Sequence, residues 1–188
     1  MNDELALLSW IKRNMPLTRA AAAALPDLRG VRLACSIHLE PKVAPAIQEM
    51  RARGAAIFLT TCNPTTVRDS VVSLLSDAGA QGHAWKGMGP ADAAEAVRRA
   101  LAWGPTHLWE MGATLASAIA EGSAGAAAGA SAAQVPAAGM ECTGSGISRL
   151  RGLAAAHRFP PFPIFNCDEV PIKEGLHNRY LVGQSAWQ

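Results

Sequence analysis

The stretch VRLACSIHLEPKVAPAIQEMRARGAAIFLTT, residues 31–61, decides the fold. It opens with an apolar run at residues 31–37, which is typical of a buried strand. Residues 42–53 follow with apolar side chains at helical spacing (Val43, Ala46, Ile47 and Met50), and residues 55–61 form a second apolar run. A strand, a helix and another strand in this order predict a βαβ unit with two parallel strands.

The same alternation continues along the chain. We expect further strands at residues 82–85, 107–111, 139–142 and 163–167, and helices at residues 65–77, 91–102 and 144–157. A helix at residues 4–13 precedes the sheet and is expected to pack on its outside. The predicted fold class is α/β: a three-layer, mostly parallel open sheet with helices on both faces, Rossmann- or flavodoxin-like. Residues 121–138 are almost entirely Ala, Gly and Ser, which predicts a flexible surface loop.

Composition excludes several classes of protein. A chain of 188 residues suits one domain. The formal charge of +2 argues against nucleic-acid binding, which needs clustered Lys and Arg. No apolar run approaches the ~20 residues that cross a bilayer, so no membrane partner is expected. The four cysteines (Cys35, Cys62, Cys142 and Cys167) show no CxxC spacing. We therefore expect no metal site, reduced thiols and a cytoplasmic protein.

Ligands of open parallel sheets bind outside the carboxyl ends of the strands. The residues that follow each predicted strand are therefore the candidates for a site, and they are unusually polar for this chain. They are His38, Leu39 and Glu40; Cys62, Asn63 and Pro64; Trp85 and Lys86; Gly112 and Ala113; Cys142 and Thr143; Asp168 and Glu169.

Five blocks of this sequence occur in an order that resembles the S-adenosylhomocysteine hydrolase (adenosylhomocysteinase) family. They are ACSIHLEPKVA (34–44), TTCNPTTVRD (60–69), HAWKG (83–87), MECTGSGISRL (140–150) and NCDEVPIKEGLHNRYLVGQS (166–185). The resemblance covers the family's substrate-binding part, and the chain ends at Gln188, where the family's NAD-binding domain follows. Gly144, Ser145 and Gly146 are not a GxGxxG fingerprint. The resemblance therefore implies a single substrate-binding domain over residues 1–188, without a cofactor.

The resemblance also implies roles for individual residues. It matches His38 to a histidine that transfers a proton near the 5′ leaving group, and Lys173 to a lysine at the ribose 3′-hydroxyl. The remaining matches imply binding of the nucleoside, with Glu40 and Lys42 at the adenine edge. These matches are Glu40, Lys42, Cys62, Asn63, Thr143 and Asn178.

Several family carboxylates are replaced in this chain. The family's DDGGD block reads WEMGA (109–113), which places Glu110 at a catalytic aspartate and Ala113 at the last aspartate. Cys142 replaces the second glutamate of EETTTG, and His177 replaces the aspartate of KFDN. Cys142 is either a small buried side chain or a thiol activated at a helix N-terminus. Without these carboxylates and NAD, the chain alone is not expected to hydrolyse S-adenosylhomocysteine.

Three hypotheses of function remain. The first is an NAD-independent enzyme that cleaves a C–S bond of S-adenosylmethionine. Its aminobutyryl chain closes on itself, and 5′-methylthioadenosine leaves as a neutral thioether. The base is left open among His38, Glu110, Cys142, Lys173 and His177. The second is a catalytically degenerate module that binds S-adenosylhomocysteine or adenosine, and the third is the substrate half of a split hydrolase. Because a lone domain must cover its own site, we also expect a homodimer.

Overall fold

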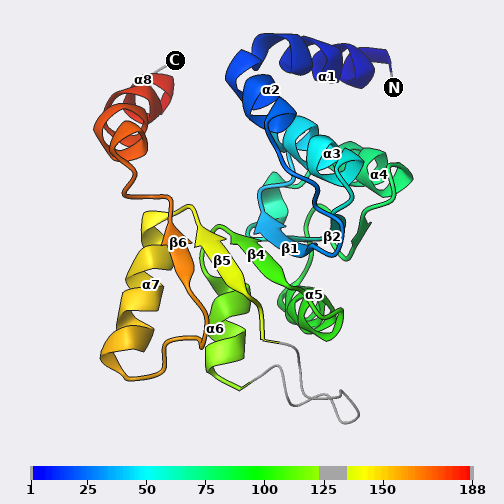
Figure 1. Ribbon diagram of the computed structural model, residues 1–188. Helices are drawn as coiled ribbons and strands as arrows, with labels where there is room; N and C mark the ends of the chain where they lie inside the picture. The colour runs from blue at the N-terminus through cyan, green and yellow to red at the C-terminus, as the bar shows by residue number, and fades with distance from the viewer. Residues whose placement is uncertain (1, 123–134, 187–188) are drawn as a thin grey trace.

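A parallel sheet of six strands forms the centre of the protein (Figure 1). The computed structural model describes residues 2–122 and 135–186. The strand order is β3-β2-β1-β4-β5-β6, so the chain builds outward from β1 to one edge, returns to the centre and then builds to the other edge. The strands are β1 (Arg32–Ile37), β2 (Ala56–Thr61), β3 (Gln81–Gly82), β4 (His107–Glu110), β5 (Ala138–Glu141) and β6 (Ile164–Asn166).

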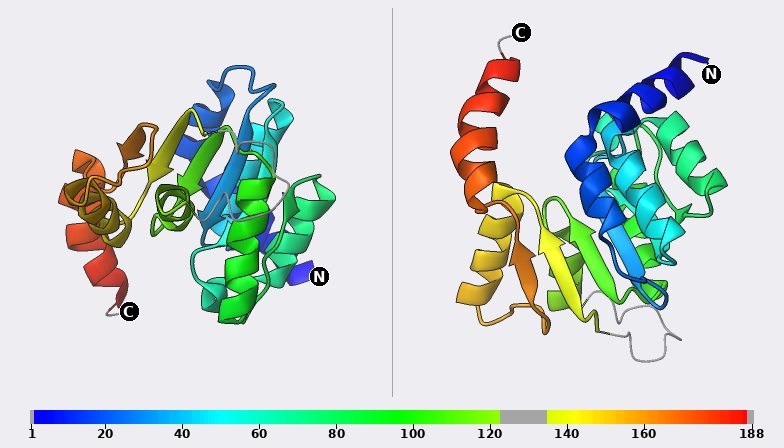
Figure 2. Two further views of the ribbon diagram at one scale, coloured as in Figure 1. Left: turned by 90° about the horizontal axis from the view of Figure 1, so that it is seen from below. Right: turned by 45° about the horizontal axis from the view of Figure 1, so that its top comes forward.

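Helices cover the sheet in two layers (Figures 1 and 2). One layer contains α5, α6 and α7, and the other contains α3 and α4 with α2 beside them. This arrangement confirms the predicted α/β fold. The helices are α1 (Asn2–Asn14), α2 (Pro16–Ala23), η1 (Pro41–Val43), α3 (Ala44–Ala52), η2 (Pro64–Thr66), α4 (Asp69–Asp77), α5 (Pro90–Ala102), α6 (Thr114–Ala120), α7 (Gly144–Ala155), η4 (Lys173–Val182) and α8 (Gly183–Ala186).

The apolar run of β1 is buried because it contributes to a core on each face of the sheet. Leu33, Cys35 and Ile37 pack with the residues of α3 and α4, whereas Ala34 packs with α5, α6 and α7. Successive side chains of a strand point to opposite faces, so a strand covered on both sides must be apolar throughout. Burial on both faces is the physical reason that this stretch identified the fold.

The predicted helix at residues 65–77 is wrong at its start. Asn63 accepts hydrogen bonds from the backbone N–H and the hydroxyl of Thr65, at 3.1 and 2.8 Å, and so begins the short turn η2. Val67 and Arg68 then have extended backbone, and Arg68 N donates to the carbonyl of Leu39 at 3.0 Å. The local cap and this tertiary bond outweigh helix propensity, so α4 begins only at Asp69.

Other differences follow from tertiary contacts. The strand predicted at residues 82–85 is the two-residue β3, where a Cβ on Gly82 would lie 2.8 Å from the carbonyl oxygen of Leu59. Helices α2, α6 and η4 were not predicted from the sequence. Helix α1 makes its main contacts with α2 and η1 rather than with a sheet face. The loop predicted at residues 121–138 lies mostly outside the described residues.

The carboxyl edge of the sheet is flanked by both ends of the described chain. Helix α1 contacts η1, which follows β1, and η4 rises from the end of β6 on the other side (Figure 1). Among the described helices, none is long and apolar enough to cross a membrane.

Candidate functional site

The reversal of strand order between β1 and β4 places the candidate site. In open α/β sheets this switch point is where the connections leave toward opposite faces, which opens space at the carboxyl edge. His38 follows β1, Glu110 ends β4 and Glu141 ends the next strand, β5. These three residues therefore follow or end strands at the same edge of the sheet, and the sequence analysis had selected His38 and Glu110 among them.

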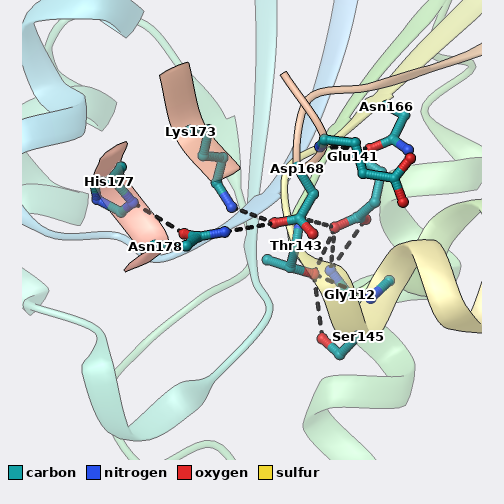
Figure 3. A network of polar contacts seen from close by, with 11 residues as sticks. Gly112, Glu141, Thr143, Ser145, Asn166, Asp168, Lys173, His177 and Asn178 are labelled. Atoms are coloured by element: carbon teal, nitrogen blue, oxygen red, sulfur yellow. Dashed lines mark hydrogen bonds and ion pairs between the residues drawn. The ribbon is translucent and has the colours of Figure 1, made fainter. Parts of the chain in front are cut away.

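Glu141 organises the middle of this edge (Figure 3). It is only 1% exposed, and its carboxylate accepts hydrogen bonds from the backbone N–H groups of Gly112, Ala113 and Thr143 at 2.7–3.1 Å. The hydroxyl of Thr143 also donates to it, at 2.7 Å. Sequence reasoning did not select Glu141 as a site residue. The signal for it was a glutamate at the last position of a strand, directly before a helix start.

Thr143 joins this carboxylate to helix α7. Its hydroxyl oxygen accepts from Gly146 N at 3.1 Å, so Thr143 is the N-cap of α7. The hydroxyl hydrogen is therefore used on Glu141, and its oxygen binds the helix and lies 3.2 Å from the hydroxyl of Ser145. The structure gives Thr143 a positioning role at the edge.

Glu110 points into the protein. Its side chain accepts from Leu115 N at 2.6 Å and Ala116 N at 3.0 Å, at the start of α6, and the residue is 2% exposed. Burial raises the pKa of this carboxyl to about 7, against the opposing effect of the two N–H groups. Both oxygens of this proposed catalytic residue are engaged with backbone.

A second polar group lies beside α7 and includes three of the predicted residues. Lys173 forms an ion pair with Asp168, and both side chains are largely buried, at 25% and 17% exposed. Asn178 donates to the same Asp168 oxygen at 3.5 Å, and His177 contacts Asn178 at 3.1 Å (Figure 3). A Cβ on Gly144 would lie 3.0 Å from the other Asp168 oxygen. The pair therefore abuts the first turn of α7, next to Thr143.

His38 belongs to a third group, at the end of β1. Its Nδ1 lies 2.7 Å from the hydroxyl of Thr66, and that hydroxyl donates to the carbonyl of Asn63 at 2.8 Å. Because Thr66 has one hydroxyl hydrogen, His38 Nδ1 must be the donor in the first contact. The neutral imidazole then carries its lone pair on Nε2, which is available to accept a proton.

The remaining predicted residues include Glu40, Lys42, Cys62 and Asn63. Glu40 and Lys42 form an ion pair at 2.9 Å, and Asn63 caps η2. Cys62 is half-buried, and burial raises its pKa to about 11, with smaller contributions from the charges of Glu141 and Glu40. Within residues 2–122 and 135–186, however, no hydrogen bond joins His38 to Thr143 or Lys173.

A polar cavity lies at this edge, and an apolar one lies toward the amino-terminal halves of the strands. The polar cavity, of about 620 Å³, is lined by Glu40, Thr66, Arg68 and Lys86 among others. The apolar cavity, of about 490 Å³, lies between α2, α3 and the faces of β4 and β5. Neither is lined by His38, Thr143 or Lys173. In the described part of the chain, no group of three His, Cys, Asp or Glu side chains is arranged to hold a metal ion.

Comparison with known proteins supports the resemblance seen in the sequence. The family model of S-adenosyl-L-homocysteine hydrolase matches residues 10–167. The chain belongs to the S-adenosyl-L-homocysteine hydrolase family. It is 29% identical to an adenosylhomocysteinase of Aeropyrum pernix and 30% identical to an S-inosyl-L-homocysteine hydrolase of Methanococcus maripaludis, over 95% of its own length in each case.

The chain spans 42% of the length of each of these family members. The similarity to these family members therefore concerns the sheet and helices described above, which carry His38, Thr143 and Lys173.

Proposed function

We propose that this chain binds a neutral adenosyl thioether or adenosine at the carboxyl edge of its sheet. The partners of the carboxylates at this edge carry the proposal. Glu40 is paired with Lys42 and Asp168 with Lys173, while Glu110 and Glu141 are bonded to backbone N–H groups. A sulfonium ligand gains most from an unpaired carboxylate, and these four carboxylates are engaged. A thioether such as S-adenosylhomocysteine, or adenosine, has no such requirement.

The groups left with spare hydrogen-bonding capacity suit a ribose. The ammonium of Lys173 has three donors, and its contact with Asp168 leaves others for hydroxyl oxygens. The free Nε2 of neutral His38 accepts from a hydroxyl. The names of the family members, adenosylhomocysteinase and S-inosyl-L-homocysteine hydrolase, are consistent with a ligand built from a purine nucleoside and homocysteine.

The helix starts at the candidate site do not fit the pyrophosphate of NAD, which the family resemblance assigns to a separate domain. Dinucleotides place that group at a helix N-terminus, where free N–H groups point outward. Here the N-terminal N–H groups of α6 are occupied by Glu110, and Thr143 and Glu141 occupy the start of α7. The proposed binding accordingly uses no redox cofactor.

Titration calorimetry tests this proposal with adenosine, S-adenosylhomocysteine and S-adenosylmethionine. We expect the first two to bind and the sulfonium to bind more weakly. Lys173→Met should weaken binding at least tenfold, whereas Arg179→Met, on an exposed residue of the same helix, should leave it unchanged. Absence of heat with all three ligands, from folded protein, contradicts the proposal.

A second candidate is cleavage of S-adenosylmethionine, and the unprotonated Nε2 of His38 favours it. In ring closure to an azetidine, the substrate amine attacks the γ-carbon, and the C–S electron pair leaves with sulfur as 5′-methylthioadenosine. Before this attack the substrate ammonium must lose a proton, and Nε2 of His38, which the Thr66 contact leaves unprotonated, accepts it. Mass spectrometry distinguishes the candidates, because release of 5′-methylthioadenosine above the protein-free background identifies an enzyme.

We also propose a homodimer. Several large side chains near the C-terminal end of the described chain face solvent. They include Ile172, just before η4, and Leu176 and Tyr180 within η4, which are 68%, 48% and 59% exposed. Monomeric proteins rarely expose such groups together. Light scattering at micromolar concentration is expected to give the mass of two chains, and a single-chain mass contradicts the proposal.

A further inference from the structure

Two cysteines lie side by side at the ends of neighbouring strands. Glu141 of β5 pairs with Asn166 of β6, so Cys142 and Cys167 are the next residues on each strand. Cys167 N donates to the carbonyl of Glu141 at 2.9 Å, which continues the ladder past the last pair. Neighbouring strands are about 4.8 Å apart, inside the range of Cα separations that a disulfide spans.

The two side chains also point to the same face. Side chains alternate along a strand, and Cys142 and Cys167 occupy equivalent positions in the register. Both are half-buried free thiols. The charge and the thiol of Cys167 contribute to the raised pKa of Cys142.

The surroundings of Cys142 act on the pKa of its thiol. The pKa of Cys142 is raised to about 12, mainly by burial and in smaller part by the neighbouring Cys167. The indole N–H of Trp109 is buried without a conventional hydrogen-bond partner and faces the Cys142 sulfur closely enough to lower that pKa in part. Burial therefore keeps the Cys142 thiol protonated at neutral pH.

We propose that Cys142 and Cys167 are an oxidation site, at which a peroxide forms a disulfide between the ends of β5 and β6. The Cys167 thiolate attacks one oxygen of hydrogen peroxide, and its O–O bond breaks to give a sulfenic acid and hydroxide. Cys142 then attacks the Cys167 sulfur. An S–S bond forms as the S–O bond breaks, and the departing hydroxide takes the Cys142 proton as water. In sum, two thiols and one peroxide give one disulfide and two waters.

The position of this bond connects it to the candidate site. Cys142 precedes Thr143, which binds Glu141, and Cys167 precedes Asp168, which binds Lys173 (Figure 3). A disulfide here joins the two polar groups through adjacent backbone and fixes the short edge strand from which η4 rises. The inference rests on the thiol geometry and is independent of nucleoside binding.

Peptide mapping tests the proposal directly. The folded, reduced chain is treated with equimolar hydrogen peroxide, denatured, alkylated and cleaved with trypsin without reduction. We expect a linked pair of peptides, residues 100–149 and 159–173, and a loss of about 2 Da for the two hydrogens. The link should disappear on treatment with dithiothreitol.

Three variants make the test specific. Cys142→Ser and Cys167→Ser should each abolish the link, and the Cys142→Ser protein should stop at the sulfenic acid of Cys167, which dimedone labels. Cys62→Ser, which removes another half-buried thiol at a strand end, should leave the link unchanged. Circular dichroism verifies that each variant is folded. Overoxidation of Cys167 in the parent chain without a link, or a link that includes Cys62, overturns the proposal.

Discussion

Gly146→Ala should severely destabilise this protein, although alanine is the better helix former. Gly146 lies in the first turn of α7, and a Cβ there would lie 2.2 Å from Cδ of Glu141 and 2.4 and 2.6 Å from its oxygens. The carboxylate cannot move away without losing bonds to Gly112, Ala113 and Thr143. Two lost bonds to a charged acceptor, at about 1.5–3 kcal/mol each, give a destabilisation of roughly 3–6 kcal/mol. At 2–4 °C per kcal/mol, Tm should fall by about 10 °C.

The matched control is Gly152→Ala, in the same helix. A Cβ at Gly152 meets nothing within 4 Å, so the variant should be about 0.5–1 kcal/mol more stable, the ordinary gain of alanine over glycine in a helix. Thermal unfolding followed by far-ultraviolet circular dichroism measures the Tm of both variants. If the two variants unfold within a degree or so of one another, Glu141 does not hold the edge in the way described.

Three further predictions concern the carboxyl edge. Burial raises the pKa of Glu110 from 4.5 to about 7, so the folded state keeps a proton that the unfolded state loses. The free energy of unfolding should therefore fall by about 3 kcal/mol between pH 4.5 and 7. In urea titrations, Glu110→Gln should lack this pH dependence. If the parent chain and the variant show the same pH dependence, Glu110 is not its cause. Thr143→Ala removes the cap of α7 and should cost about 1–2 kcal/mol in urea unfolding, whereas Thr143→Ser should cost little. A disulfide between Cys142 and Cys167 closes a loop of about 25 residues and should stabilise the oxidised chain by up to ~3 kcal/mol; equal melting with and without dithiothreitol would contradict this.

Chain order and burial explain which parts of the fold were predictable. The strands β1, β2 and β4 were placed within a residue or two because each is covered on both faces and must be apolar. Helix α6 was missed because its start depends on Ala113 in a left-handed conformation, with φ of 52°, held by Glu141 from another strand. No local pattern contains that contact.

The candidate site shows the same division. Apolar runs alternating with helices imply parallel strands, and parallel strands bring their carboxyl ends to one edge. The sequence alone therefore determined that His38, Cys62, Glu110, Cys142 and Thr143 follow or end neighbouring strands. Only the tertiary structure decided which of them carry free polar groups, because that depends on partners distant in the chain. Folding turned Glu110 inward onto α6, paired Lys173 with Asp168 and placed Cys142 against Cys167.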